Sequence, residues 1–194
     1  FGGLVTSCGM IFTGHPEVDH EEGNEELGLH GRLSFIPAKS VATECNWEGE
    51  DYVVSVRGRM REVVVFGTNL ELTREISTVL GEKCLRIHDQ IENLSVDPSP
   101  LMFVYHTNPG FPLLDRGTRL VINSQQTTEW LEDREVGPEE YQVVQSPQET
   151  AHDDVYIHRP IADEEGNVQV ALVNDALKLG IYWGFPLQEM PIVT

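Results

Sequence analysis

Short runs of alternating apolar and polar residues, separated by turn signals, recur along most of this chain of 194 residues. In LELTREISTV (70 to 79), Leu72, Arg74 and Ile76 fall on one face of an extended strand, because side chains alternate between the two faces. Other clear runs are DYVVSVRGRM (51 to 60), CLRIHDQIEN (84 to 93) and VQVALVN (168 to 174). Strands this short, repeated at roughly ten-residue spacing, predict an all-β fold of antiparallel sheets packed as a sandwich.

Short loops that contain glycine join several of these runs. LGEK (80 to 83) predicts a hairpin turn, and WEGEDY (47 to 52) and DEEGNVQ (163 to 169) have the same turn chemistry. A short helix is expected only at TTEWLEDRE (127 to 135). Because no repeat of fixed period and no linker divides the chain, we expect a single β-sandwich domain over residues 1 to 194.

The charge and the cysteines restrict the partners and the compartment. Thirteen Lys and Arg stand against 32 Asp and Glu, which gives a formal net charge of −19. A field of that sign repels phosphate backbones and anionic lipid, so we predict that the protein binds neither nucleic acid nor membrane. Cys8, Cys45 and Cys84 lie far apart without a CxxC pair, which predicts three reduced thiols and a cytoplasmic location.

The first candidate site is the motif LHGR (29 to 32), in an irregular stretch between strands. Binding side chains concentrate on loops that a rigid scaffold holds in place. Gly31 permits a close backbone approach, and the planar guanidinium of Arg32 can bind hydroxyl or carboxylate oxygens. Taken alone, His30 fits a structural histidine better than a functional one, so its importance depends on a second site.

The second candidate site is YHTNPGFPLL (105 to 114). His106 ends an apolar strand, Asn108 offers both a hydrogen-bond donor and an acceptor, and the prolines restrict the loop that follows. A neutral imidazole donates a proton from one nitrogen and accepts one at the other, as general acid–base catalysis requires. His158 also ends a strand and is a weaker third candidate.

A metal or an organic cofactor has little support in the sequence. His15, Asp19 and His20 in HPEVDHEE (15 to 22) could ligate zinc, nickel or iron. Their spacing fits no closed ligand set, however, and a solvated acidic loop is the favoured reading. There is no glycine-rich nucleotide motif and no nucleophile elbow. We therefore predict no metal and no cofactor.

The order of the motifs resembles that of the aldose 1-epimerase (galactose mutarotase-like) superfamily. The matching segments are LHGR, residues 70 to 94 with the sequence IENL at their end, YHTNPGFPLL and a strand that ends in LVN. Within the superfamily the chain looks most like the DUF4432-like branch, which carries HGR and YHxNxGxPLL. The resemblance covers nearly the whole chain. It implies an antiparallel β-supersandwich and an enzyme that interconverts the α and β anomers of aldoses without a cofactor.

The resemblance also implies roles for four residues. His106 matches the histidine that protonates the ring oxygen of the sugar, and His30 matches an earlier histidine that hydrogen-bonds near that oxygen. Arg32 and Asn108 are the residues expected to bind the substrate. The substrate is accordingly expected to be a carbohydrate, and a homodimer is left open as the assembly.

One element of the family pattern is missing. The family's catalytic base is a glutamate in a late strand near the C-terminus, and no residue of this chain matches it. Glu189 comes too early in the pattern, and the chain stops at Thr194. We therefore expect an internal segment or a truncated relative, incomplete at both ends.

Three functions follow from these observations. The leading one is an aldose 1-epimerase-like enzyme that uses a histidine and a carboxylate for acid–base catalysis. The alternative is a non-catalytic carbohydrate-binding protein on the same fold, in which Trp47, Trp130 or Trp183 could stack on sugar rings. A metal-dependent isomerase or lyase that uses the histidines and the acidic loop is the third.

Overall fold

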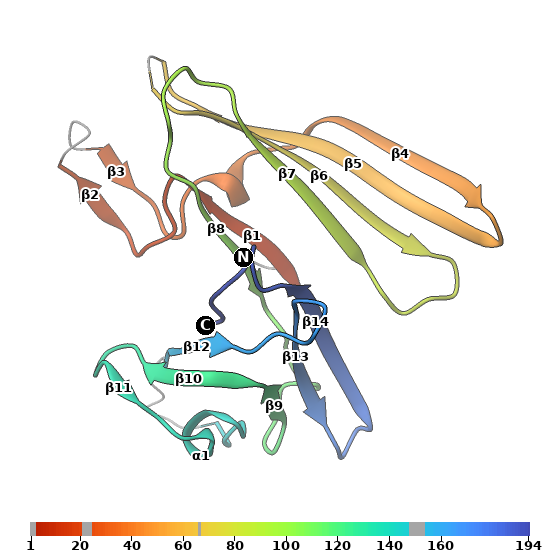
Figure 1. Cartoon of the computed structure of the whole chain (residues 1–194), viewed down its shortest axis with the longest axis vertical. Helices are drawn as coiled ribbons and strands as arrows, with labels where there is room; N and C mark the ends of the chain where they lie inside the picture. Colours follow the sequence, from red (N-terminus) through yellow and green to blue (C-terminus); the bar gives the residue numbers. More distant parts are fainter. Residues whose placement is uncertain (1–2, 21–24, 66, 148–153) are drawn as a thin grey trace. The chain divides into compact units, whose positions relative to one another are not determined.

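The alternating runs of the sequence form antiparallel strands, so the prediction of an all-β fold is confirmed (Figure 1). The computed structural model describes residues 3–20, 25–65, 67–147 and 154–194. Contacts along the chain gather in two compact units, Phe1–Asn108 and Pro109–Thr194. The single domain expected over residues 1 to 194 stays a prediction. In the part of the chain that the structure describes, no helix is long and apolar enough to cross a membrane.

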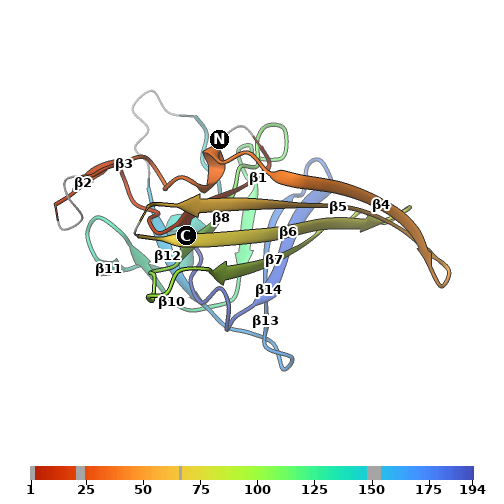
Figure 2. The same cartoon turned by 90° about the horizontal axis from the view of Figure 1, so that it is seen from above.

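The first unit contains a four-stranded antiparallel sheet, a two-stranded ladder and a small hairpin. Its elements are β1 (Val5–Met10), β2 (Glu17–Asp19), β3 (Glu25–Leu27), the 3-10 helix η1 (Leu33–Phe35), β4 (Lys39–Glu48), β5 (Asp51–Val63), β6 (Asn69–Val79), β7 (Arg86–Asn93) and β8 (Met102–Thr107). Strands β4, β5, β6 and β7 follow one another across the large sheet (Figures 1 and 2). Strand β1 pairs with β8, and β2 pairs with β3. The hairpins predicted at WEGEDY and LGEK are both present.

The apolar core of the first unit lies between the large sheet and the β1–β8 ladder. Leu70 and Leu72 of β6 are buried together with Met10 of β1 and Leu33 of η1. Burial of each such side chain stabilises the fold by about 1.5–3 kcal/mol. Leu72 and Arg74 share the face that β1 covers, because Arg74 also hydrogen-bonds to a β1 side chain. The shared face predicted from the alternation is therefore confirmed for these two residues.

The described residues of the second unit form two three-stranded antiparallel sheets. Its elements are β9 (Arg119–Ile122), β10 (Ser124–Glu129), β11 (Arg134–Glu135), the one-turn helix α1 (Pro138–Tyr141), β12 (Tyr156–Pro160), β13 (Asn167–Asn174) and β14 (Leu179–Pro186). One sheet has the strand order β11-β10-β12, and the other has the order β14-β13-β9. Along β13, buried residues alternate with more exposed ones, as expected for a strand with one face in a core.

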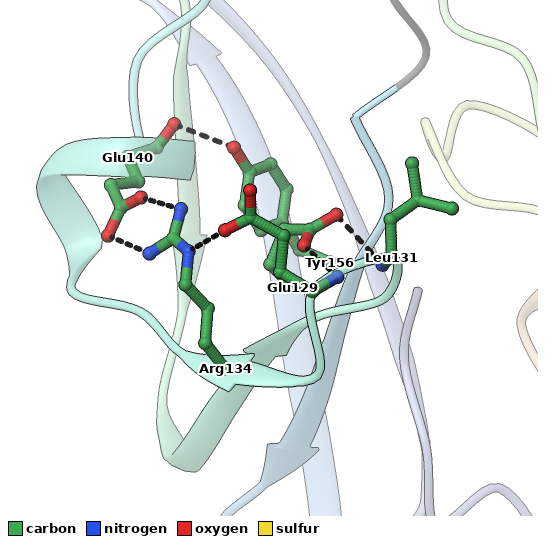
Figure 3. Close-up of polar contacts among 6 residues, drawn as sticks. Glu129, Leu131, Arg134, Glu140 and Tyr156 are labelled. Carbon is green, nitrogen blue, oxygen red and sulfur yellow. Dashed lines mark hydrogen bonds and ion pairs between the residues drawn. The ribbon is translucent and has the colours of Figure 1, made fainter.

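The prediction of a helix at residues 127 to 135 is wrong. The first half of that segment belongs to β10, which pairs with β12, and the second half turns back as β11 (Figure 3). The buried carboxylate of Glu129 accepts hydrogen bonds from the backbone N–H groups of Leu131 (3.0 Å) and Glu132 (2.6 Å). These bonds satisfy the backbone of a tight turn, so strand pairing replaces the helix. The helical turn lies further on, at Pro138–Tyr141.

The turn predicted at DEEGNVQ is present, but the prediction that its flanking strands form a hairpin is wrong. The carboxylate of Asp163 accepts hydrogen bonds from the backbone N–H groups of Glu165 (3.1 Å) and Asn167 (2.8 Å) and so closes the turn. The two strands that it joins do not pair, because β12 pairs with β10, and β13 pairs with β9 and β14. A local turn can therefore be predicted from sequence, whereas the pairing partners of the flanking strands cannot.

His158, the weaker third candidate, is a buried residue of the second unit. Its side chain is 2% exposed, and its Nδ1 lies 2.9 Å from the hydroxyl of Thr127. The ring of Tyr141 packs edge-on against the imidazole at a centroid distance of 4.7 Å. Burial lowers the pKa of His158, because removal from water disfavours the charged ring. This environment fits a neutral core histidine.

The lowered pKa of His158 predicts a pH-dependent stability. Between the folded-state pKa and the ordinary value of 6.5, the unfolded chain binds more protons than the folded chain, so stability falls as the pH falls through this range. His158→Gln removes the titrating group. The loss in the free energy of unfolding that this substitution causes should therefore be smaller at pH 5 than at pH 7.5. Urea unfolding across this range measures the change. The control is the unaltered protein, whose stability should fall more steeply over this range than that of His158→Gln; equal slopes for the two proteins would contradict the assignment.

Candidate functional site

The LHGR motif is held against β1 by backbone contacts. The N–H of Gly9 donates to the carbonyl of His30 (2.8 Å), and the N–H of His30 donates to the carbonyl of Gly14 (2.9 Å). Gly9 and Gly31 form an isolated parallel bridge. These bonds fix the backbone of the loop immediately beside the imidazole of His30.

Only glycine fits at position 31. Its φ is +78°, and a Cβ there would overlap the carbonyl oxygen of Phe12 and crowd Gly9. The preceding His30 has a φ of +57°, which is uncommon for a residue with a side chain. The close approach expected of Gly31 is therefore present.

The structure brings His30 and His106 together. Their ring centroids are 5.6 Å apart, with an angle of 47° between the ring planes, and both side chains are half-buried. His106 lies in β8, opposite Thr6 of β1. The two histidines are 76 positions apart in the chain, so only the folded first unit places them side by side. Their catalytic roles stay predictions.

A hydrogen bond fixes the tautomer of His30. Its Nδ1 lies 2.9 Å from the carbonyl oxygen of Thr13. A carbonyl can only accept, so Nδ1 carries the proton of this bond. The neutral ring then has its lone pair on Nε2. The carbonyl of Thr13 thus sets both the tautomer and the orientation of the imidazole.

Arg32 is engaged by two carboxylates. Its guanidinium pairs with Glu25 of β3 and, at 3.2 Å, with Glu62 of β5. The side chain of Glu62 is only 3% exposed. Burial raises the pKa of this carboxyl, against the lowering effects of the charge and hydrogen bond of Arg32 and of the backbone at Ile11. The sequence reasoning missed Glu62; its signal was a carboxylate two positions after Met60, on the face of β5 that packs against the core.

Arg32 therefore has a structural role in addition to the predicted one. The ion pairs link the LHGR loop to β3 and to the large sheet. A guanidinium has five N–H donors, so contact with a substrate still depends on those that the carboxylates do not use. The prediction that Arg32 binds substrate is not tested by these contacts.

Asn108 anchors the chain at the end of β8. Its side-chain amide donates to the carbonyl of Gly3 (2.9 Å), and its backbone N–H donates to the carbonyl of Leu4 (2.8 Å). The backbone bond continues the pattern of the β1–β8 ladder beyond Thr107, and the side-chain bond ties Asn108 to the residue before Leu4. The amide nitrogen is thus used within the protein, and the substrate-binding role of Asn108 stays a prediction.

The loop after Asn108 is anchored within the second unit. Asn174, the last residue of the LVN motif, is buried and donates to the carbonyl of Leu113 (3.2 Å) and to the hydroxyl of Thr118 (3.2 Å). The hydroxyl of Thr118 in turn donates to the carbonyl of Leu113 (2.7 Å). Sequence reasoning noted LVN only as part of a motif. A polar residue at the end of an apolar strand was the signal for this anchor.

The acidic stretch that suggested a metal is described only in part. His15, Asp19 and His20 are described, whereas the residues that follow at positions 21 and 22 lie outside the described residues. Among the residues with described positions, no group of three or more His, Cys, Asp or Glu side chains is arranged to hold a metal ion. The metal hypothesis gains no support from the structure.

Comparison with solved structures assigns the fold. The chain matches a crystal structure of a protein from Klebsiella pneumoniae subsp. pneumoniae MGH 78578, described as a "putative aldose 1-epimerase", with a TM-score of 0.89 and 26% identity. The match covers 99% of this chain and 49% of that one, so the chain spans about half of the solved protein. The protein is therefore of the all-β, aldose epimerase-like class, as the resemblance predicted.

Comparison with family models gives the family. The model described as "Domain of unknown function (DUF4432)" matches residues 1–194. The chain belongs to this family, and the predicted place in the galactose mutarotase-like superfamily is confirmed. No curated protein matches the chain.

The glycine contact of LHGR can be tested by a matched pair of substitutions. Gly31→Ala forces a Cβ into the backbone of Phe12 at a positive φ and should lower the free energy of unfolding by at least about 2 kcal/mol. Gly28→Ala, three residues earlier, has open space around its Cβ and should change it by less than about 0.5 kcal/mol. Urea unfolding compares the two variants. Similar losses for both would show that Gly31 makes no special contact.

Proposed function

We propose that the protein interconverts the anomers of a free aldose, or carries out a related sugar isomerisation, by acid–base catalysis. The observation that carries this proposal is the pair of imidazoles of His30 and His106, at 5.6 Å between ring centroids, on a fold shared with an aldose epimerase-like neighbour. Two adjacent rings can address two neighbouring oxygens of one sugar carbon. The paired motifs LHGR and YHTNPGFPLL supply both rings.

The reaction needs balanced proton transfers. A base removes the proton of the C1 hydroxyl while an acid protonates the ring oxygen, so the bond between C1 and the ring oxygen breaks and a C1 carbonyl forms. Rotation about the C1–C2 bond presents the other face of the carbonyl, and the reverse transfers close the ring as the opposite anomer. General acid–base catalysis of this kind contributes about 10²–10⁴-fold to the rate. No electrons are exchanged with a second reactant.

In this proposal His106 is the acid that protonates the ring oxygen. It lies in a paired strand, so its backbone is fixed by the ladder with β1. In the same proposal His30 acts beside it and hydrogen-bonds near the ring oxygen, with its ring oriented by the bond from Nδ1 to the carbonyl of Thr13. We assign the base to no residue of this chain. Glu62 does not fit that role, because its buried carboxylate pairs with Arg32.

Exposed aromatic side chains support a second candidate function, non-catalytic carbohydrate binding. Trp47 is 69% exposed and lies against Tyr52, with ring centroids 5.1 Å apart, and Trp130 is 60% exposed. Exposed aromatic faces can stack on sugar rings. This supports a non-catalytic carbohydrate-binding protein as the alternative. A cytoplasmic location is proposed with either function, in keeping with three free thiols.

Exchange spectroscopy by NMR on a panel of aldoses tests the proposal. The complete protein should accelerate anomer exchange of at least one sugar, and His106→Gln should lower kcat by about 10²–10⁴-fold with little change in sugar affinity, since the general acid is lost. His88→Gln, on the solvent-exposed side of β7, is the matched control and should retain full activity.

Two results would count against this function. Failure of the unaltered protein to accelerate exchange of any aldose removes it. Saturable sugar binding without acceleration favours the carbohydrate-binding alternative instead, and Trp47→Ala should then weaken that binding.

A further inference from the structure

We propose that Arg74, Asp89 and Tyr105 form a buried clamp that positions His106 for the reaction. The proposal rests on the proposed function of His106 and adds positioning residues that do not touch the substrate. The clamp lies on the other side of the β1–β8 ladder from the imidazole. None of its members belongs to LHGR, and only Tyr105 lies in the YHTNPGFPLL motif.

The clamp joins four strands of the first unit through short hydrogen bonds. Arg74 of β6 pairs with Asp89 of β7 through two parallel bonds, at 2.7 and 2.5 Å. A second bond from its Nη2 reaches the hydroxyl of Ser7 in β1 (2.5 Å). The hydroxyl of Tyr105 in β8 donates to the same Asp89 carboxylate (2.7 Å). The large sheet is therefore bonded to both strands of the ladder.

These groups are buried deeply enough for their bonds to be strong. The side chain of Asp89 is 6% exposed and that of Arg74 is 16% exposed, while Ser7 is 6% exposed. The guanidinium also lies 5.8 Å from the centre of the Tyr105 ring. A fork-shaped guanidinium on a carboxylate fixes orientation as well as distance. A buried ionic network with its partners in place holds its strands to one geometry.

The clamp acts on the position next to His106. Tyr105 pairs with Ser7 across the ladder, and the next pair along is His106 with Thr6. Adjacent side chains of a strand point to opposite faces. The clamp therefore binds one face of β8, and the imidazole of His106 projects from the other. A rotation of β8 about its axis would move the imidazole, and such a rotation would break the bonds of Tyr105 and Ser7. The clamp thus restrains the motion that would separate His106 from His30.

Arg74 and Tyr105 of the clamp keep their protons near neutral pH. Burial and the hydrogen bond to Asp89 raise the pKa of Tyr105, so the phenol stays protonated and continues to donate. Burial disfavours the charge of Arg74, but the hydrogen bonds and charge of Asp89 outweigh it and raise its pKa. Both groups therefore keep their hydrogen bonds to Asp89 while the proposed reaction takes place at His106.

Tyr105→Phe tests the proposal in the complete protein, because it removes one hydroxyl and retains the ring. Loss of positioning should lower kcat for anomer exchange by about tenfold with a change in KM below about twofold, since small misplacements of a catalytic group reduce the rate steeply. The matched control is Ile91→Val, two residues beyond Asp89 on β7 and packed in the same core. It loses packing but no hydrogen bond, so kcat should stay within about twofold.

A second measurement does not depend on activity. The ¹⁵N signals of the His106 imidazole, followed across a pH titration, should differ from the unaltered protein in Tyr105→Phe and remain unaltered in Ile91→Val. Ser7→Ala, which removes the bond to β1 and leaves the pair of Arg74 with Asp89, should reproduce the effect if Tyr105→Phe does not fold.

The outcomes separate this proposal from the proposed function. Unchanged kcat and unchanged His106 signals in Tyr105→Phe overturn the clamp, as do equal losses in Tyr105→Phe and Ile91→Val. If the unaltered protein accelerates no anomer exchange, the proposed function fails, and the His106 signals alone then decide whether the clamp fixes the imidazole.

Discussion

The arrangement of the candidate site depends on a contact between two stretches of backbone. Gly9 of β1 and Gly31 of the LHGR loop form a backbone bridge, and a side chain at Gly31 would crowd Gly9 as well as overlap the carbonyl of Phe12. The hydrogen bond from the N–H of Gly9 to the carbonyl of His30 fixes the loop at this approach. Because β1 pairs with β8 along its whole length, a loop bound to β1 is also placed beside His106. The two imidazoles meet as a consequence.

The β1–β8 ladder then serves two purposes at once. On one face, its side chains join the core and the buried ionic network of Arg74 and Asp89. On the other face it presents His106 to His30. A rigid strand with one face in a core is a common basis for a precisely held polar group, because packing and hydrogen bonds fix the backbone that carries it. The catalytic hypothesis and the stability of the first unit are therefore linked through one pair of strands.

Much of the fold follows from local patterns. The alternation in residues 70 to 79 gives the shared face of Leu72 and Arg74, and the loops at residues 47 to 52 and 80 to 83 give their hairpins. The helix expected at residues 127 to 135 fails because Glu129 satisfies the turn with its own carboxylate and strand β12 supplies a pairing partner. A pairing partner about thirty residues away is not visible in a local window.

The sequence by itself determined the antiparallel strand content and the family motifs, and it marked Gly31 as a place where backbone can approach closely. It also marked His30 and His106 as residues to consider, because each lies beside a restricted loop and their two motifs occur together in the family pattern. Only the tertiary structure decided that these rings lie 5.6 Å apart, that Thr13 sets the tautomer of His30, and that Glu62 engages Arg32. Those relations join segments far apart in the chain. They arise from strand pairing and from burial, which act between residues whatever their separation in sequence.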